Sequence, residues 1–416
     1  MQTNAILENQ RLTSEEAMHL EQQYGAHNYK PLPVVLNRGE GVFLYDPEGN
    51  RYYDFLSAYS AVNQGHCHPR IIDAVLDQAR QLTLTSRAFY NDQLGKAEKM
   101  LCETFGYEKA LFMNSGAEAV ETAIKVARRW GYEKKGVASN EAKILVATNN
   151  FHGRTATIVS FSTDRDSRNG FGPYTPGFYI IPYDDLHSLD EAMQMENVVG
   201  FLVEPMQGEA GVIVPDEGYY KGIRELCNQH NVLWMDDEIQ TGLARTGKML
   251  AVDYEDVQPD VLILGKALSG GTMPVSAILA NDEVMLTIRP GQHGSTFGGN
   301  PLAARVAVAS LEVLLDEKLA ENAYQQGQYF RERMHAIDSR AIRQVRGKGL
   351  LNAIVILDEY TTTDAYGICK LMSKKGLLAK QTHGNVIRFA PPLVINQDQI
   401  AEGCDIIEET IREVTC

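Results

Sequence analysis

The feature that most constrains the fold is a series of short apolar runs separated by longer amphipathic stretches. Five runs have the length of buried strands: 110–113, 144–147, 199–203, 232–235 and 261–264. The first is followed by a stretch of helical periodicity with one apolar face, comprising Val120, Ala123, Ile124, Ala127 and Trp130. A helix is also expected over about 216–230. Strands that alternate with helices in this way are typical of an α/β fold with a mainly parallel sheet flanked by helices.

After about residue 300 the pattern changes. A helical stretch over 301–315 leads into a mixed region, in which 352–356 and 386–389 have the composition of strands with helix between them. We therefore predict an N-terminal segment over 1–59, a large α/β domain over 60–316, and a smaller C-terminal α+β domain over 317–416.

The charge balance limits the classes of partner. Lys and Arg number 39 against 54 Asp and Glu, which gives a net charge of −15 at pH 7. Binding to nucleic acid or to an anionic membrane needs a basic face that displaces counterions, so neither partner is expected. Small anionic ligands need only a few local basic residues, and small-molecule substrates remain open.

Cysteine use and the N-terminal composition bear on the compartment. The six cysteines are far apart and form no CxxC pair, which favours free thiols in a reducing compartment. The neighbours His66, Cys67 and His68 cannot easily converge on one ion, so no metal site is expected. The first 25 residues have no apolar core and contain four Glu, unlike a signal or transit peptide, and no apolar run reaches membrane-spanning length. We expect a cytoplasmic protein.

Two polar residues follow neighbouring strands at the points where the strands end. The run 232–235 leads into Asp237, and the run 261–264 leads into Lys266. The carboxyl ends of parallel strands are where α/β proteins hold ligands. A pyridoxal-phosphate site needs a lysine that bonds covalently to the cofactor and an acid that keeps its ring nitrogen protonated.

Each of these features also has an ordinary structural explanation. Lys266 by itself could be a solvated surface lysine, and Asp237 could be a helix cap. Lys266, however, lies between an apolar strand and small residues, where a solvating side chain is unusual. Ser115-Gly116-Ala117 opens a helix and offers backbone N–H groups to a phosphate, although most such turns are only connections.

Several blocks of sequence carry a resemblance to a known family. The chain resembles class III aminotransferases of fold type I in the blocks 114–119, 151–155, 237–242 and 265–267. Other blocks resemble the ornithine aminotransferases more specifically: 24–29, 60–69, 346–352 and 387–392. The resemblance runs from about residue 20 to 410. It implies a pyridoxal 5'-phosphate enzyme that moves the terminal amino group of L-ornithine to 2-oxoglutarate in two half-reactions, giving glutamate-5-semialdehyde and glutamate.

The resemblance also implies a role for each cofactor residue. Lys266 is the lysine that bonds to the cofactor and then moves the proton, and Asp237 pairs with the ring nitrogen. Near neutral pH, Lys266 can act as a base only if burial or positive charge lowers its pKa. The remaining implied contacts are Phe151 on the ring face, Gln240 near the ring hydroxyl, Gly116 and Ala117 after Ser115 at the phosphate, and Ser295 and Thr296 at the phosphate of a neighbouring subunit. The family builds its sites at a dimer interface, so we expect a homodimer or a higher homo-oligomer.

Substrate selection is implied for five further residues. Arg154 can form a two-pronged bond to the distant carboxylate of ornithine. Tyr29 bonds the same end and Tyr59 shapes the adjoining pocket, although ordinary packing would also account for either tyrosine. Arg388 suits the α-carboxylate of 2-oxoglutarate, and Glu209 occupies the position of the glutamate that masks this arginine while ornithine binds.

Three rival interpretations remain. The nearest is another ω-aminotransferase, acting on acetylornithine, 4-aminobutyrate or lysine. His152 bears on this choice, because ornithine aminotransferases often carry a bulkier aromatic there, while Phe-His-Gly-Arg also occurs in acetylornithine aminotransferases. Tyr29 and Tyr59 favour unmodified ornithine. A catalytically inactive relative could have lost Lys266 and Asp237, and a nucleotide-binding oxidoreductase would need a GxGxxG turn that the candidate strands lack.

Overall fold

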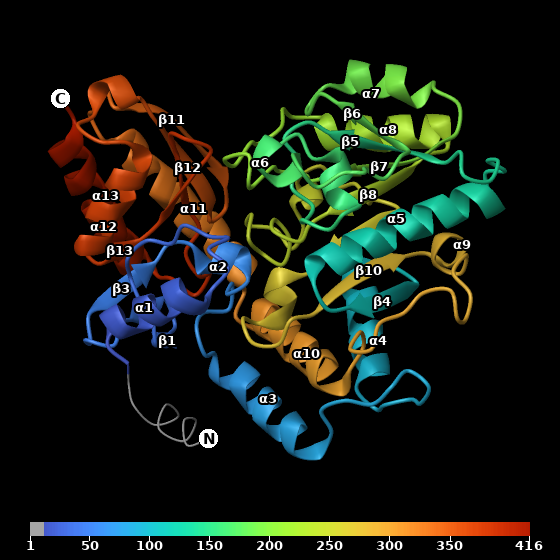
Figure 1. The fold of residues 1–416 in the computed structure, drawn as a ribbon, viewed down its shortest axis with the longest axis horizontal. Helices are drawn as coiled ribbons and strands as arrows, with labels where there is room; N and C mark the ends of the chain where they lie inside the picture. The colour runs from blue at the N-terminus through green and yellow to red at the C-terminus, as the bar shows by residue number, and fades with distance from the viewer. Residues whose placement is uncertain (1–11) are drawn as a thin grey trace.

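The computed structural model describes residues 12–416, which form two lobes (Figure 1). One lobe contains a seven-stranded sheet and its helices. The other combines the N-terminal strands with the C-terminal region, which lie side by side although they are far apart in sequence (Figure 1).

The large sheet has the strand order β4-β10-β9-β8-β7-β5-β6. Its strands are β4 (Lys109–Met113), β5 (Lys143–Ala147), β6 (Phe178–Ile181), β7 (Val198–Val203), β8 (Leu233–Asp237), β9 (Val261–Leu264) and β10 (Ser276–Ala280). The five predicted strands are confirmed. Strands β9, β8, β7, β5 and β6 are parallel, whereas β10 runs antiparallel to both of its neighbours. The mainly parallel sheet expected from the sequence is therefore present.

Helices bury both faces of this sheet. The long helix α5 (Gly116–Glu133) packs on one face, where its apolar residues meet one alternate set of strand residues, such as Val146 and Ile263. The other set, including Leu145 and Leu262, packs with α8 (Tyr219–His230) and α10 (Pro301–Asp316) in a second core. Burial on both faces explains why these strands have continuous apolar runs instead of alternating patterns.

The remaining helices of this lobe are shorter or lie at its edge. Helix α10 packs against α3 (Pro69–Gln81) and α4 (Leu94–Phe105). The short helices are α6 (Arg165–Arg168), α7 (Leu186–Met193) and α9 (Asp282–Met285). Three 3₁₀ turns also lie in this lobe: η1 (Ile158–Phe161), η2 (Ala251–Tyr254) and η3 (Lys266–Ser269). A fourth, η4 (Asp358–Tyr360), belongs to the second lobe, and the short helices α1 (Ser14–Tyr24) and α2 (Ser57–Ser60) belong to the N-terminal segment.

The second lobe contains two small sheets. One has the order β11-β12-β15-β14 and is antiparallel, with α11 (Leu319–His335), α12 (Ala365–Lys374) and α13 (Gln397–Val414) beside it. Its strands are β11 (Ile342–Lys348), β12 (Leu351–Ile356), β14 (Lys380–Thr382) and β15 (Val386–Phe389). The other sheet contains β1 (Arg38–Glu40), β2 (Phe43–Tyr45), β3 (Arg51–Asp54) and β13 (Leu377–Leu378). Because β13 pairs with β3, the N-terminal segment is joined to the C-terminal region. Domain boundaries near residues 60 and 316 remain our proposal.

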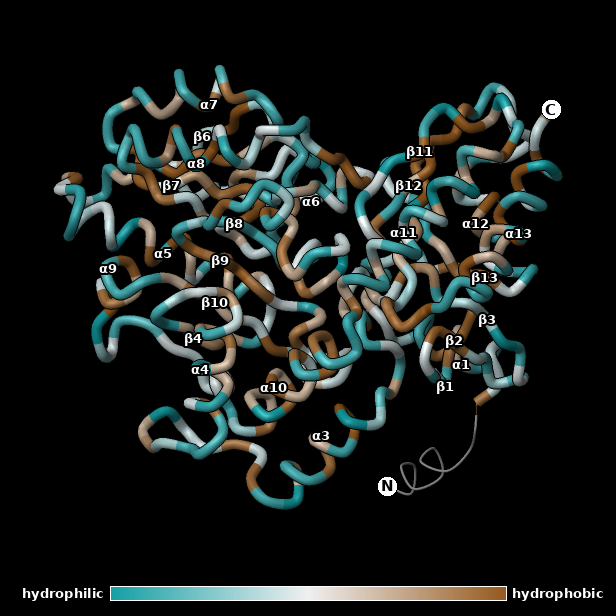
Figure 2. The backbone as a smooth tube through the Cα atoms, turned by 180° about the vertical axis from the view of Figure 1, so that it is seen from behind, coloured by the Kyte–Doolittle hydropathy of each residue, from teal (hydrophilic) through white to brown (hydrophobic). Residues whose placement is uncertain are grey.

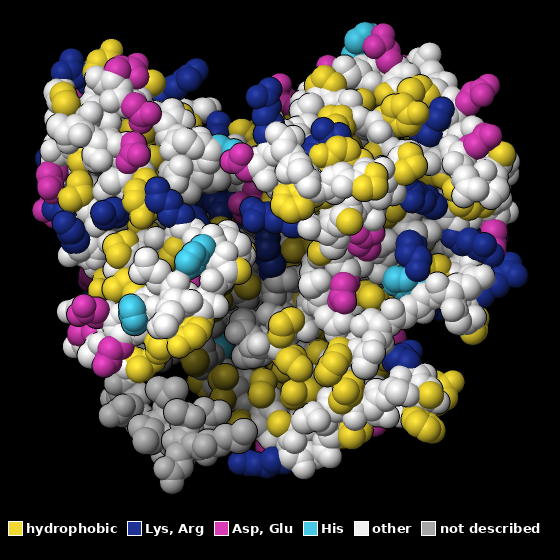
Figure 3. All heavy atoms as spheres, viewed as in Figure 1, with side chains coloured by type: hydrophobic (Ala, Val, Ile, Leu, Met, Phe, Trp, Pro, Cys, Tyr) yellow, Lys and Arg dark blue, Asp and Glu magenta, His cyan; other side chains and the backbone are white. Residues whose placement is uncertain are grey.

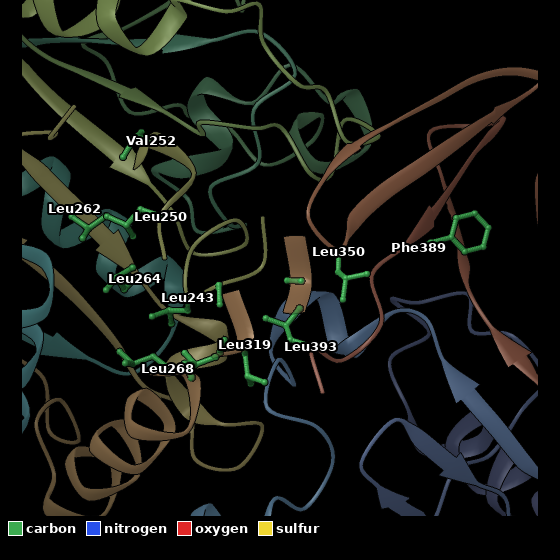
Figure 4. Packing of buried hydrophobic residues seen from close by; sticks show 14 of the residues in the cluster. Leu243, Leu250, Val252, Leu262, Leu264, Leu268, Leu319, Leu350, Phe389 and Leu393 are labelled. Carbon is green, nitrogen blue, oxygen red and sulfur yellow. The ribbon is translucent and has the colours of Figure 1, made fainter. Parts of the chain in front are cut away.

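The two lobes share a continuous apolar core. Leu262 and Leu264 of the large sheet belong to the same buried cluster as Leu350, Leu393 and Phe389 (Figure 4). Apolar segments accordingly run through the interior of both lobes (Figure 2). Within the described residues, no helix combines the length and apolarity needed to cross a membrane.

A buried arginine also joins the lobes. The Arg245 guanidinium donates to Asn63 Oδ1 and to the carbonyls of Leu350 (2.9 Å) and Pro391 (2.6 Å). Burial lowers the pKa of Arg245 to about 9, with Asp54 opposing the shift. Neutral oxygens therefore hold this charge at the junction of three chain segments.

Candidate active site

A pocket of about 200 Å³ opens at the carboxyl ends of the parallel strands, near the hollow between the lobes. Basic side chains gather in that hollow on the face shown in Figure 3. The pocket is lined by Gly116, Ala117, Phe151, His152, Gly153, Glu204, Met206, Asp237, Ile239, Gln240 and Lys266. Six of these residues were predicted cofactor contacts, and segments far apart in sequence bring them together.

Lys266 is presented by a tight turn directly after β9. The strand ends at Leu264, and Lys266 begins a 3₁₀ turn. The φ angle of Lys266 is 41°, in the left-handed region that residues other than glycine rarely adopt. Burial lowers the pKa of the Lys266 amine, while the nearby carboxylates Glu209 and Asp237 oppose the shift. A larger neutral fraction makes this amine a better nucleophile and base near neutral pH.

Asp237 is the last residue of β8 and is 4% exposed. One carboxylate oxygen accepts the Ile239 N–H at 3.1 Å, and the other contacts His152 Nδ1 at 2.7 Å. The adjacent acids have other surroundings. Glu238 accepts backbone N–H groups from Ala251 and Val252, and the oxygens of Asp236 have no hydrogen-bond partner among the described residues. Neither Asp236 nor Glu238 lines the pocket, so Asp237 is the acid that this strand end supplies to it.

The N-terminus of α5 forms another wall. Ser115 caps the helix by accepting the Glu118 N–H at 3.2 Å, and Glu118 accepts the Ser115 N–H in return. This capping box leaves the first N–H groups of the helix, those of Gly116 and Ala117, at the pocket. A Cβ at Gly116 would lie 3.0 Å from Ile239, so glycine fits closely here. Helix N-terminal N–H groups and the helix dipole favour an anion.

Glu204 is a pocket acid that the sequence analysis missed. It directly follows β7, is 6% exposed, and accepts the Phe151 N–H at 2.8 Å, which fixes the backbone that carries the Phe151 ring. Burial, and then the Asp237 carboxylate, raise the pKa of Glu204 well above its usual range. Its position after a buried strand is the pattern that identified Asp237, so the same criterion applied to 199–203 would have found it.

An ion pair borders the pocket on the side of the second lobe. Arg388 Nη1 on β15 donates to Glu209 Oε1 at 2.7 Å and to the Gly208 carbonyl at 3.2 Å. Gln240 Nε2 donates to the same Glu209 oxygen at 3.2 Å, which links the pair to the pocket. Although burial alone would raise it, the Arg388 guanidinium holds the pKa of Glu209 below its usual value. Glu209 and Arg388 are therefore in contact, and the masking role of Glu209 stays a prediction.

Tyr59 lies against this ion pair. The Tyr59 ring centroid is 5.0 Å from the Arg388 guanidinium carbon. Four consecutive residues, 57–60, have positive φ angles between 46° and 73° and form a left-handed turn that presents the ring. Such backbone costs roughly 1–2 kcal/mol per non-glycine residue, so the surrounding structure holds Tyr59 in this position at a cost.

Four predicted residues lie away from the pocket lining. Arg154 is exposed, with its guanidinium carbon 5.8 Å from the Phe151 ring centroid, near the pocket mouth. Tyr29 is 66% exposed and lines a separate surface hollow beside α1 (Ser14–Tyr24). Ser295 and the exposed Thr296 lie on the loop before α10, where Asn114 donates to Ser295 Oγ at 2.8 Å. Their proposed roles do not rest on contact with the pocket in one chain.

The two histidines of the apparent metal motif have separate carboxylate partners. His66 Nε2 contacts Asp54 at 2.7 Å, and His68 Nε2 contacts Glu317 at 2.9 Å. Over residues 12–416 the structure contains no group of three His, Cys, Asp or Glu side chains arranged to hold a metal ion.

Comparison with known families agrees with this site. A family model described as "Aminotransferase class-III" matches residues 24–411, nearly the whole chain. The chain therefore belongs to the class III aminotransferases.

Similarity to individual proteins narrows this assignment to the ornithine aminotransferases. The chain is 59% identical over 398 residues to the mitochondrial ornithine aminotransferase of Drosophila melanogaster, covering 96% of this chain and 92% of that protein. It is 53% identical over 402 residues to the ornithine aminotransferase of Plasmodium falciparum, covering 96% of this chain and 97% of that protein.

Solved structures show the same fold. The ornithine aminotransferase of Toxoplasma gondii, described with pyridoxal phosphate at partial occupancy in its active site, has a TM-score of 0.95 at 47% identity, covering 97% of this chain and 95% of that chain. An acetylornithine aminotransferase of Elizabethkingia anophelis has a TM-score of 0.88 at 55% identity, covering 97% of this chain and 100% of that chain. The predicted α/β fold of type I aminotransferases is confirmed.

Proposed function

We propose that this chain is a pyridoxal-phosphate-dependent ornithine aminotransferase. It transfers the terminal amino group of L-ornithine to 2-oxoglutarate, giving glutamate-5-semialdehyde and glutamate. The observation that carries this choice of substrate is the 2.7 Å ion pair between Glu209 and Arg388 beside the pocket of Lys266. The two substrates make opposite demands: 2-oxoglutarate must place a carboxylate near the cofactor, whereas L-ornithine must keep its carboxylate away. An arginine that is covered for one substrate and free for the other meets both demands.

The pocket residues fit pyridoxal 5'-phosphate. Lys266 supplies an amine, Asp237 a carboxylate, and the N-terminus of α5 an anion site, all at one pocket. The Gln240 amide oxygen is buried and has no hydrogen-bond partner among the described residues, which suits a ring hydroxyl as donor. When bound, the cofactor supplies an aldehyde that takes up the amino group and a ring that withdraws electrons from the reacting carbon.

The chain's own residues would then divide the work. Asp237 would hold a proton on the ring nitrogen, and the N–H groups of Gly116 and Ala117 would bind the phosphate. Phe151, whose backbone Glu204 holds, would cover one ring face. Lys266 Nζ would take the proton from the substrate carbon and pass it to the cofactor. The lowered pKa of Lys266 favours this role as a base.

The substrate-side residues would choose which amine reacts. While Glu209 covers Arg388, the α-carboxylate of ornithine finds no free cation near the cofactor, so ornithine enters with its terminal amine first. Arg154, near the pocket mouth, would bind the distant carboxylate, with Tyr59 shaping the wall and Tyr29 reaching the same end from the N-terminal segment. When 2-oxoglutarate enters, its carboxylate would replace Glu209 at Arg388, in a two-pronged pair.

We further propose a homodimer, or a higher homo-oligomer, in which Ser295 and Thr296 bind the neighbouring subunit's phosphate. Phe297 on the same loop is 50% exposed, and Phe89 and Tyr90 are exposed as well, which supports an apolar contact surface there. A monomeric variant should bind the cofactor weakly.

Six unpaired cysteines support a reducing compartment, and we propose the cytoplasm. Fractionation of the source cells tests this against the mitochondrial location in the names of the Drosophila and rat relatives.

The second candidate activity uses N²-acetylornithine. The 55% identity to an acetylornithine aminotransferase favours it, as does His152 at the pocket. The test compares initial rates on L-ornithine, N²-acetylornithine, 4-aminobutyrate and L-lysine with 2-oxoglutarate, using purified cofactor-loaded protein and trapping the semialdehyde as it cyclises. We expect L-ornithine to be fastest. A faster rate on acetylornithine would transfer the assignment to that substrate, and no rate on any amine would refute the aminotransferase.

A further inference from the structure

His152 makes a contact that packing alone does not require. Its side chain is fully buried, and its Nδ1 lies 2.7 Å from Asp237 Oδ2, itself almost fully buried. The other ring nitrogen, Nε2, is buried and has no hydrogen-bond partner among the described residues. The ring also lies beside Phe161, at a centroid distance of 6.0 Å.

These contacts determine which nitrogen carries the proton. An ionised Asp237 only accepts hydrogen bonds, so Nδ1 must carry the hydrogen. Nε2 has no acceptor among the described residues, so the tautomer that carries its hydrogen on Nδ1 fits these contacts. His152 therefore donates one hydrogen bond to Asp237.

Asp237 is consequently held from two directions. The Ile239 N–H reaches Oδ1 at 3.1 Å, and His152 reaches Oδ2 at 2.7 Å. The backbone contact lies within the same turn and cannot by itself fix the carboxylate plane, whereas His152 comes from the loop after β5. Each oxygen keeps a free lone pair, so the carboxylate can still accept a hydrogen bond from the pocket.

We propose that His152 is a positioning residue that orients Asp237 towards the ring nitrogen of pyridoxal phosphate. The proposal rests on the proposed function only for the identity of the cofactor, not for the choice of amine. It gives His152 a role in the cofactor chemistry in addition to its place in the pocket wall. A residue without an Nδ1-like donor would leave Asp237 held by the backbone alone.

Substitutions of nearly equal shape separate this donor from packing. In His152→Asn the amide nitrogen occupies the place of Nδ1, two bonds from Cβ, so the donor is kept. His152→Leu has a similar branched shape with no donor. His152→Gln moves the donor one bond further out, towards the place of Nε2. Thermal unfolding by circular dichroism confirms that each variant is folded.

The experiment measures cofactor binding and the state of the ring nitrogen. The dissociation constant is determined by equilibrium dialysis of each apoenzyme, and the ¹⁵N chemical shift is recorded on holoenzyme loaded with ring-¹⁵N-labelled cofactor. We expect His152→Leu to weaken binding by about 10-fold or more, because a hydrogen bond to a charged group is lost, and to move the ¹⁵N shift towards unprotonated pyridine. In His152→Asn the dissociation constant should lie within about 3-fold of wild type, and the ¹⁵N shift should be near the wild-type value. In His152→Gln both values should lie closer to those of His152→Leu.

Two results would overturn the proposal. One is a folded His152→Leu with wild-type affinity and ¹⁵N shift. The other is a folded His152→Asn as impaired as His152→Leu, since packing would then account for the effect. Failure of the wild type to use ornithine would refute the proposed substrate but leave both of these measurements valid, so the two failures are distinguishable.

Discussion

Two pairs, each joining an acid to a nitrogen base, lie at the pocket, and they are built differently. Asp237 and His152 are both nearly fully buried, and a backbone N–H pins the second oxygen of Asp237. Glu209 and Arg388 share the same 2.7 Å separation, but the Glu209 side chain is 24% exposed and also accepts from Gln240. The first pair lies within the large lobe, whereas the second joins the loop after β7 to β15 of the other lobe.

The difference indicates which contact is permanent. Separating Asp237 from His152 would leave buried groups unsatisfied, with no alternative partner in place. Glu209 can keep its bond to Gln240 and exchange Arg388 for solvent, and Arg388 can exchange Glu209 for a substrate carboxylate. We interpret the Asp237–His152 pair, on the cofactor side of the pocket, as a fixed contact. We interpret the Glu209–Arg388 pair, on the substrate side, as a switch that opens when a substrate carboxylate binds Arg388.

The largest expected effect comes from Lys266, which both pairs flank. Lys266→Ala removes the nucleophile and the base, so activity on ornithine should fall by at least about 10⁴-fold. Rates should be measured together with the visible absorbance of covalently bound cofactor, with Lys374→Ala on the surface as a control. Retention of more than a few per cent of wild-type activity would contradict the assigned role.

A smaller effect, on selectivity, is expected at the switch. Glu209→Ala exposes Arg388 permanently, which should raise α-amino transfer relative to terminal transfer by roughly 10- to 100-fold, or about 1.4–2.8 kcal/mol. Chromatographic analysis of the two keto products from ornithine measures this ratio. Glu209→Gln keeps the shape and loses the charge, and it should be intermediate. Unchanged product ratios in both variants would show that Glu209 is not the mask.

The buried Glu204, on the cofactor side of the pocket, should make the free energy of unfolding depend on pH. Because burial and Asp237 raise its pKa, folded Glu204 retains its proton above the usual pKa near 4.3, and this contribution to stability is lost as pH rises through the raised value. Glu204→Gln keeps an acceptor for Phe151 without that loss. Its unfolding free energy in urea should exceed wild type by an amount that grows from pH 5 to pH 8, reaching roughly 1–3 kcal/mol. A gap that shrinks with rising pH would contradict the buried, protonated acid.

The smallest effect concerns the left-handed turn that presents Tyr59. Ala58 is exposed with φ 46° and ψ 46°, so Ala58→Gly removes the Cβ clash at some cost in chain entropy, and stability should change by only about 0–1 kcal/mol. Ala58→Val, β-branched, should lose about 1–2 kcal/mol. Urea unfolding of both variants measures the difference. A Gly variant less stable than the Val variant would refute the strained turn.

Much of the large lobe was predictable because strands buried on both faces leave continuous apolar runs. Strands 110–113 and 261–264 were placed within one residue, and the lysine after β9 and the acid ending β8 line one pocket. Strand β10 was missed. Its composition resembles the parallel strands, and nothing local reveals that it runs antiparallel between β4 and β9.

Features that depend on contacts between distant segments could not be predicted from local pattern. In the run Asp236-Asp237-Glu238, only the sheet decides which acid faces the pocket. The bond from His152 to Asp237 joins residues 85 positions apart, and the pairing of β3 with β13 joins opposite ends of the chain. The positive φ angles over 57–60 involve no glycine, so the sequence gives no warning of the turn that places Tyr59.

The most direct test of the account follows one nitrogen atom. Wild-type holoenzyme is incubated with L-ornithine labelled with ¹⁵N only at the terminal amine and with unlabelled 2-oxoglutarate, and the glutamate formed is analysed by mass spectrometry. A fixed cofactor side with a masked Arg388 predicts glutamate that carries the label from the first turnovers. Unlabelled glutamate would show that the α-amine reacts, and would contradict the switch at Glu209 and Arg388.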